Sequence, residues 1–145
     1  MNWKKEAVGE LRDYLARKEA LEHLRERQAA LRLQLEGIRA SKSDTTPVMG
    51  GGSRVEDGMI SRMEELQRLE LNYRAAAQLV SLTERGLESL TETQRLVLER
   101  FYIYRTPNHV EDLMERLNVE QSQVYRIKEE ALRKFTIAMY GLTDY

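Results

Sequence analysis

The 145-residue chain contains no cysteine and only two prolines, and it has no long apolar run. The absence of cysteine excludes disulfides, zinc–thiolate sites and thiol catalysis. No segment approaches the roughly 18 consecutive apolar residues that a membrane-spanning helix needs. Residues 1–5 lead into charged sequence rather than into the apolar core of a signal peptide. We therefore expect a cytoplasmic protein with no membrane partner.

A surplus of either charge is also missing, because the formal net charge is −1 although 32% of the residues are charged. Any binding to nucleic acid must then depend on where the cations lie, since the total charge gives no attraction to phosphate. The abundant residues are Leu, Glu, Arg and Ala, which favour helices over sheets. The composition predicts an all-α fold.

One long helix is predicted from about residue 3 to residue 40, where the only helix-weakening residues are the isolated Gly9 and Gly37. At about 1.5 Å per residue this helix would be on the order of 55 Å long, whereas a compact chain of this size is roughly 38 Å across. It must protrude or pack against an equally long partner. Its apolar seam, with alternating steps of three and four, consists of Leu21, Leu24, Gln28, Leu31, Leu35 and Ile38.

A partner helix is predicted within the chain, beyond a loop at 41–54 that contains Pro47 and three consecutive glycines. Residues 1–88 would then form a coiled-coil-like helical hairpin. Its polar interruptions and its Glu- and Arg-rich outer sides suit association with a second copy, while the alternative is a hairpin without a partner. The apolar positions of the second helix are Met59, Met63, Leu66, Tyr73, Ala77, Val80 and Leu87, and the interruptions are Lys18, Gln28 and Arg62.

Residues 89–141 are predicted to form a separate unit of three helices. Thr91 and Gln94 have the spacing of a capping box, in which two otherwise unpaired amides are satisfied reciprocally. Pro107 ends this first helix, because its ring disfavours helical geometry in the preceding residue. The apolar face of the helix is formed by Leu96, Val97, Phe101 and Tyr102.

The next two helices are joined by a tight turn. Asn108 and Glu111 repeat the capping spacing and open a short helix, and Asn118 tolerates the left-handed backbone that such a turn needs. This order is the layout of a helix-turn-helix, whose last helix enters the major groove of DNA. The inward residues are Val110, Leu113, Met114 and Leu117 on the second helix and Val124, Ile127, Ala131 and Phe135 on the third.

The opposite side of the third helix carries side chains that suit DNA recognition. Arg126 could bind guanine, Gln121 or Gln123 could bind adenine with two hydrogen bonds, and Ser122 could donate or accept one. Tyr125 and nearby cations could contact phosphates. The simpler interpretation is a solvated polar face. The predicted DNA-binding residues are Gln121, Ser122, Gln123, Tyr125, Arg126, Lys128, Glu129, Arg133 and Lys134.

Three segments resemble, in this order, region 4 of bacterial sigma-70 factors, which recognises the promoter −35 element. They are the capped helix at 90–98, the turn and helix at 117–127 and the tail at 131–135. The resemblance implies that positions 121, 122, 125 and 126 face bases. Three positions depart from the family pattern: Met114 replaces a small residue, Asn118 a turn glycine, and Glu120 a Ser or Thr cap. A bulky Met114 would widen the helix packing, and Glu120 is a weaker cap that would repel phosphate.

The whole arrangement is similar to phage-encoded late transcription regulators of the ArpU and RinA type. Its elements are a Glu- and Arg-rich helix, the loop near Pro47, a second helix and the terminal unit ending near Gly141. The resemblance implies a transcription activator encoded by a phage or prophage. Nothing in the chain resembles the sigma segments that melt promoter DNA, so we do not expect a complete sigma factor.

Local charge limits how the unit could bind DNA. Between Arg95 and Lys134 there are eight Lys or Arg residues and seven Asp or Glu residues. Tight DNA binders gather several phosphate-contacting cations, so one copy alone is expected to bind weakly. A homodimer or higher oligomer formed through the hairpin would place two recognition helices on spaced half-sites. Docking on RNA polymerase would also raise the affinity for DNA, because the chain would then bind as part of a larger assembly.

Two other classes of protein compete with a regulator. An enzyme is disfavoured because His23 and His109 are far apart without a metal-ligand pattern, and the glycines at 50–52 lack the lysine and strand of a phosphate-binding loop. We therefore predict no catalysis and no cofactor. An adaptor that resembles a small terminase subunit or an anti-sigma protein is the alternative, with the helix-turn-helix used for packaging DNA or for protein contact.

Overall fold

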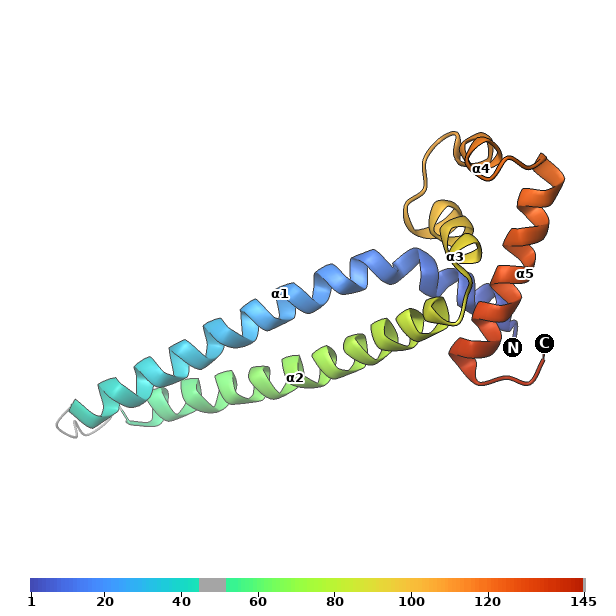
Figure 1. Ribbon diagram of the computed structural model, residues 1–145. Helices are drawn as coiled ribbons and strands as arrows, with labels where there is room; N and C mark the ends of the chain where they lie inside the picture. The colour runs from blue at the N-terminus through green and yellow to red at the C-terminus, as the bar shows by residue number, and fades with distance from the viewer. Residues whose placement is uncertain (45–51, 145) are drawn as a thin grey trace. The chain divides into compact units, whose positions relative to one another are not determined.

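The computed structural model describes residues 1–44 and 52–144, and the elements among these residues are all helical, with no strand. The predicted all-α class is confirmed. The helices are α1 (Trp3–Asp44), α2 (Gly52–Glu88), α3 (Glu92–Leu98), the π-helical segment η1 (Glu99–Ile103), α4 (His109–Leu117) and α5 (Gln121–Tyr140), as Figure 1 shows.

The predicted loop at 41–54 is too long at both ends. Helix α1 continues to Asp44 and α2 begins at Gly52. Residues 41–44 contain neither Gly nor Pro, so nothing in them removes a helical hydrogen bond or adds backbone freedom. The remainder of the predicted loop, residues 45–51 with Pro47, lies outside the described residues.

The chain divides into two compact units at positions that differ from the predicted boundary near residue 88. One unit is Lys18–Ala77, and the other combines Met1–Arg17 with Gln78–Tyr145. The second unit therefore includes the beginning of α1 and the end of α2, which the sequence assigned to the hairpin. The reason is a shared core, because Leu11 of α1 and Leu87 of α2 are buried in the same cluster as Phe135 of α5.

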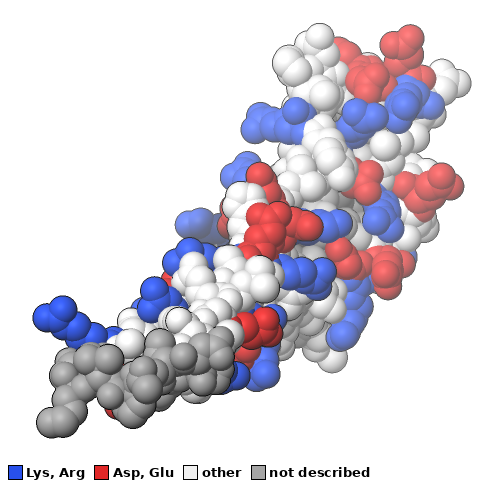
Figure 2. Space-filling view, turned by 90° about the vertical axis from the view of Figure 1, so that its left-hand side faces the viewer, with Lys and Arg blue, Asp and Glu red and all other residues white. Residues whose placement is uncertain are grey.

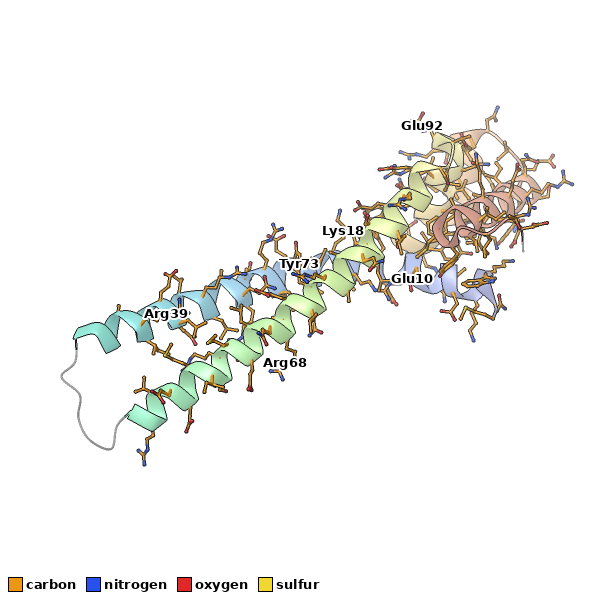
Figure 3. All side chains as sticks on the ribbon, turned by 90° about the horizontal axis from the view of Figure 1, so that it is seen from below. Glu10, Lys18, Arg39, Arg68, Tyr73 and Glu92 are labelled. Atoms are coloured by element: carbon orange, nitrogen blue, oxygen red, sulfur yellow. The ribbon has the colours of Figure 1, made fainter. Side chains whose placement is uncertain are left out.

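In the unit Lys18–Ala77, α1 and α2 lie side by side and run in opposite directions (Figure 3). Arg25 donates to the Tyr73 hydroxyl at 2.8 Å, and Arg62 donates to the Gln34 amide oxygen at 3.1 Å. Because residue 25 contacts residue 73 and the later residue 34 contacts the earlier residue 62, the two helices are antiparallel. Such exposed contacts stabilise the pair by little each. Further ion pairs across the two helices join Arg27 to Glu65 and Arg32 to Glu70.

The predicted seam of α1 faces α2, since Gln28, Leu31 and Leu35 are buried. On α2, however, the assignment of Met63 to the seam is wrong, because its side chain is 42% exposed. At about 100° per residue Met63 lies about 60° around the helix from Leu66. It therefore points to the side of the pair and not into it, whereas Met59 and Leu66 are partly buried.

The second unit is built on an apolar cluster to which four helices contribute. The beginning of α1 takes part in it, which the sequence did not predict. Trp3 adds a ring contact with Tyr140 of α5, with centroids 4.8 Å apart, and the Tyr14 hydroxyl donates to Glu84 at 2.7 Å. The buried members of the cluster are Ala7, Leu11, Leu87, Leu98, Ala131, Leu132, Phe135 and Met139.

Local capping chemistry is as predicted at two of three positions. The capping box of Thr91 and Gln94 is present, and Asn118 ends α4 with a left-handed backbone (φ 54°). The predicted cap by Asn108 is wrong, because its side chain makes no hydrogen bond to the helix. Its backbone (φ −111°, ψ 38°) lies outside the extended region in which a cap side chain reaches back to the first turn.

None of the helices in the described part of the chain combines the length and the apolar character needed to cross a bilayer.

Gly86 allows α2 to approach α5 closely. A Cβ atom at this position would lie 2.6 Å from Cε2 and 2.7 Å from Cδ2 of Phe135, a buried ring in a packed cluster. We expect Gly86→Ala to lower the free energy of unfolding by about 1–3 kcal/mol, because overpacking displaces the ring. Gly9→Ala is the matched control, since a Cβ there meets nothing within 4 Å and should stabilise the helix by about 0.5–1 kcal/mol. Urea unfolding measures both, and equal effects of the two substitutions would contradict the close approach.

Candidate nucleic-acid interface

Helix α5 has one buried side and one exposed side. Val124, Ala131, Leu132, Phe135, Thr136 and Met139 are buried. The polar side chains of the first two turns are exposed, and they include the residues predicted to contact bases: Gln121, Ser122, Gln123, Tyr125 and Arg126.

The N-terminal half of α5 is held in place by α3 and α4. Val124 is fully buried in a second apolar cluster with Val97 of α3 and with Val110 and Leu113 of α4. The left-handed Asn118 reverses the chain between α4 and α5, and its backbone N–H donates to Met114. Met114, where the region-4 pattern has a small residue, is only partly buried and packs against the cluster from the side. The bulky residue is therefore accommodated at the edge of the cluster.

The residues predicted for phosphate contact are not equally available. Lys134 and Arg126 make no hydrogen bond or ion pair with any described residue, and both are exposed. The side chain of Lys128 is only 17% exposed and forms an ion pair with Glu129 at 3.1 Å. Arg133 is exposed but pairs with Asp144 at 2.6 Å. Of the cations predicted on this helix, Arg126 and Lys134 are thus the two that are exposed and have no partner among the described residues.

An aromatic platform supports Tyr125. Its ring meets Phe101 edge to face, with centroids 5.8 Å apart, and Phe101 meets His109 in the same way at 4.7 Å. The Lys128 ammonium lies 5.4 Å from the Phe101 centroid and 5.3 Å from that of Tyr125. These contacts hold the Tyr125 ring at the edge of the exposed side. The sequence assigned Phe101 only to packing, and no local pattern joins it to His109 and Tyr125.

Glu129 is the acidic residue among the predicted contacts, and its charge is compensated within the chain. The Lys4 ammonium of α1 donates to the Glu129 carboxylate at 2.6 Å. This hydrogen bond is the main cause that lowers the pKa of Glu129, and Lys128 adds to it. The carboxylate therefore repels a phosphate less than an unpaired one would. Lys4 lies far away in sequence, so its role was not predictable.

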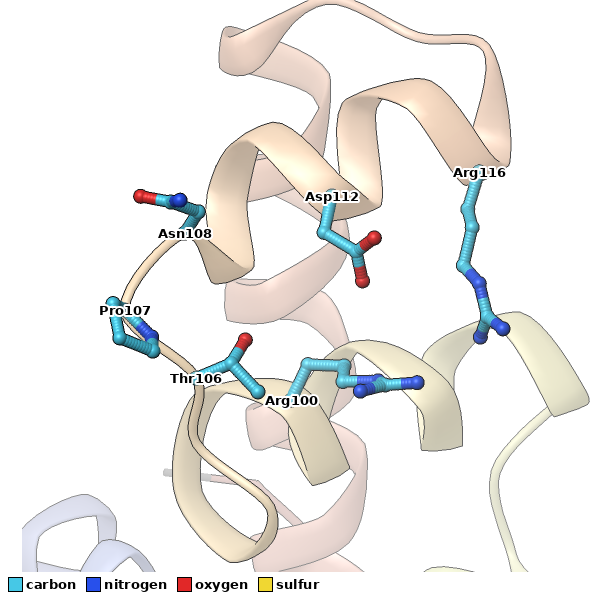
Figure 4. A pocket seen from close by; sticks show the side chains of 6 residues that line it. All are labelled: Arg100, Thr106, Pro107, Asn108, Asp112 and Arg116. Carbon is cyan, nitrogen blue, oxygen red and sulfur yellow. The ribbon is translucent and has the colours of Figure 1, made fainter.

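A pocket of about 420 Å³ lies between η1 and α4 (Figure 4). Arg100 and Arg116 form no hydrogen bond or ion pair with described residues. Asp112 and Arg116 point from α4 toward η1 and α3. Asp112 offsets one of the two positive charges, which makes this a weaker anion site than two arginines alone. The lining is completed by Thr106, Pro107 and Asn108.

On the face that Figure 2 shows, basic and acidic side chains alternate and form no continuous basic surface. The described residues contain no group of three or more His, Asp or Glu side chains that could hold a metal ion. The exposed side of α5 combines hydrogen-bonding side chains with two exposed cations, Arg126 and Lys134, that have no partner among the described residues.

We expect Lys4→Ala to raise the pKa of the Glu129 carboxyl toward its ordinary value, because the largest cause that lowers it is removed. A lowered pKa in the folded state stabilises the fold above the unfolded-state pKa, and this stabilisation is lost as the pH falls through the folded-state pKa. Both side chains are nearly half exposed, so the free energy of unfolding should change by less than about 1 kcal/mol. An NMR titration of the Glu129 carboxyl carbon measures the shift, with Lys5→Ala as the control. An unchanged titration of Glu129 in Lys4→Ala would rule out the pairing.

No family model, curated protein or solved structure matches the chain.

Proposed function

We propose that α4, the turn at Asn118 and α5 form a helix-turn-helix and that the protein is a sequence-specific DNA-binding transcription regulator. The observation that carries the proposal is the exposure of five recognition-type side chains on the first two turns of α5, while the other side of this helix is anchored in two apolar clusters. A helix held in this way presents a rigid surface, and a rigid surface favours recognition of one sequence over another. The five residues are Gln121, Ser122, Gln123, Tyr125 and Arg126.

The chemistry of these side chains fits the major groove. The groove is about 12 Å wide and accepts an α-helix of about 10–12 Å diameter. Arg126, which has no partner among the described residues, can bind O6 and N7 of guanine, and Gln121 can bind adenine. Tyr125 is held by Phe101 and has its hydroxyl available for a phosphate. Lys134 supplies a phosphate contact that fixes the register without recognising sequence.

The charge of the unit favours binding as part of an assembly. Ion pairs with Asp144 and Glu129 compensate two of the cations of α5, so few free positive charges remain to displace counterions from DNA. A second copy of the chain would double the number of phosphate contacts and provide two recognition helices. Contact with RNA polymerase would raise the effective concentration at a promoter. The resemblance to region 4 and to phage late regulators supports a role in late-gene activation with the host polymerase.

A second candidate is a phage adaptor that resembles a small terminase or an anti-sigma protein, and the scarcity of free cations on α5 favours the use of this helix for protein contact. Such a protein would use the exposed side of α5 for packaging DNA or for protein contact. Stoichiometry separates the two candidates, because a ring of many subunits suits packaging and a dimer suits a regulator. Sedimentation equilibrium of the whole chain measures it.

Selection of bound duplexes from a random DNA pool, with and without RNA polymerase, tests the proposal, and substitutions then identify the contacts. Arg126→Ala should weaken binding to the selected site by roughly 5- to 150-fold, equivalent to about 1–3 kcal/mol, and relax specificity at one base pair. Lys134→Ala should weaken binding to all sequences alike and reduce the salt slope by about one. Fluorescence anisotropy at several salt concentrations measures both effects.

Arg39→Ala is the control for these substitutions, because Arg39 is an exposed arginine of the unit Lys18–Ala77 and its removal changes the net charge equally. Its affinity for the selected site should equal that of the unchanged chain. Absence of any enriched sequence, or equal binding by Arg126→Ala and the unchanged chain, would remove the assignment of α5 as a recognition helix.

A further inference from the structure

The outward side of α2 carries exposed apolar residues that the hairpin does not use. Ile60 is 54% exposed and Leu71 is 66% exposed. They are eleven residues apart, which corresponds to about three helical turns, so both project from the same side of α2. At about 100° per residue this side lies roughly 140–160° from Tyr73, which contacts α1. Two large apolar side chains thus point away from the partner helix.

Charged residues flank this apolar pair in an ordered way. Along α2 the two acidic residues, Asp57 and Glu64, precede the two basic residues, Arg68 and Arg74. All four side chains are exposed, and none makes a hydrogen bond or ion pair with a residue that the structure describes. In Figure 3, Arg68 points away from α1. We call these four residues together with Ile60 and Leu71 the outer strip of α2.

The outer strip is symmetric about one point of the sequence to within half a residue. Ile60 and Leu71 are equally far from the midpoint between residues 65 and 66, and so are Asp57 and Arg74. The third pair, Glu64 and Arg68, is centred on residue 66. Each pair therefore joins an apolar residue to an apolar one or an acid to a base.

A symmetric arrangement of this kind is self-complementary under a two-fold axis. When two copies of a helix pair in opposite directions, a residue of one copy meets the residue at the same distance beyond the midpoint on the other copy. Ile60 would meet Leu71 of a second copy, and Glu64 would meet Arg68. Asp57 would lie level with Arg74 but about 100° away from it around the helix. A parallel pair would instead place like charges opposite each other at each of the charged positions, which is destabilising.

We propose that the outer strip of α2 is a homodimer interface, in which α2 packs antiparallel to α2 of a second copy about a two-fold axis near residues 65 and 66. The outer strip provides the surface for the self-association that the proposed function requires. In this one respect the proposed interface rests on the proposed function. The partner is a second copy and not another protein, because the charges of the strip complement their own reversed order. The interface spans about 26 Å of helix from Asp57 to Arg74, at about 1.5 Å per residue.

Analytical ultracentrifugation of the whole chain tests the apolar part of this interface. Ile60→Glu/Leu71→Glu should weaken dimerisation by about 100-fold or more, since both apolar contacts are lost and like charges replace them. Leu33→Glu is the matched control, because Leu33 is 68% exposed on α1 and lies outside the strip. A monomeric unchanged chain, or a double variant that dimerises as well as the control, would overturn the proposal. Because all these residues are exposed, circular dichroism should show unchanged helicity.

Cysteine crosslinking tests the direction of pairing, because the chain has no cysteine of its own. Ile60→Cys and Leu71→Cys chains, one of them carrying a size tag, are oxidised separately and as a mixture. Only the mixture should give a covalent dimer, which contains one chain of each kind. In an antiparallel pair of Ile60→Cys chains the two thiols would be about 17 Å apart, far beyond the reach of a disulfide. Crosslinking of Ile60→Cys with itself, or no crosslink in the mixture, would overturn the antiparallel register.

These outcomes are separate from those of the DNA experiments. A chain that is monomeric but loses DNA affinity in Arg126→Ala would overturn the dimer interface alone. A chain that crosslinks as expected but binds no selected sequence would overturn the proposed function alone.

Discussion

Burial of the apolar side of α5 is the constraint on which the rest of the second unit depends. Phe135 and its neighbours are covered by residues from both of the long helices, with Leu11 from α1 and Leu87 from α2. Fully burying a side chain of this size contributes about 1.5–3 kcal/mol, so the cluster outweighs the exposed ion pairs of the unit. The close approach at Gly86 allows this packing, since any side chain there would meet the Phe135 ring. With its apolar side held, α5 has to present its polar side outward.

Ion pairs then decide which of the outward charges are available. Lys4 compensates Glu129, Asp144 compensates Arg133, and Lys128 lies over aromatic rings beside Glu129. The exposed side of α5 is thus a hydrogen-bonding surface with few free cations. In the function we propose, such a surface gives specificity more readily than affinity, because phosphate contacts supply most of the binding energy and base contacts supply the discrimination. An assembly of two chains, or of the chain with RNA polymerase, would then supply the missing affinity.

Helix α2 illustrates how one amphipathic helix can carry two sets of contacts. Its inward residues, such as Leu66 and Tyr73, face α1. The outer strip lies on the other side and consists of exposed residues. Its charged residues change from acidic to basic along the helix. A surface of this kind costs little in the single chain, because its charges remain hydrated and only two large apolar groups are exposed. It becomes favourable only against a surface with the reversed order, which is the property expected of a two-fold interface.

Much of the secondary structure was predictable from the sequence because it depends on short-range chemistry. The capping box of Thr91 needs only a residue three positions away, and the left-handed turn at Asn118 needs only a tolerant side chain. The seam of α1 follows from periodicity, as burial of Leu31 and Leu35 shows. The exposed and buried sides of α5 follow from the same rule.

The predictions that failed at this level also have local reasons. At Asn108 the backbone conformation keeps the side chain away from the helix that it was expected to cap. Met63 lies at the margin of the apolar arc of α2, where a small rotation of the helix decides between burial and exposure.

The sequence by itself thus determined the all-α class, the capping box at Thr91, the left-handed turn at Asn118 and the polar composition of the exposed side of α5, since each is set by residues within one or two helical turns. The tertiary structure alone decided that the beginning of α1 packs on α5, that Lys4 compensates Glu129, and that Phe101 supports Tyr125. These contacts join residues that are far apart in the chain. Their formation depends on how the helices pack together, and no short-range pattern records that packing.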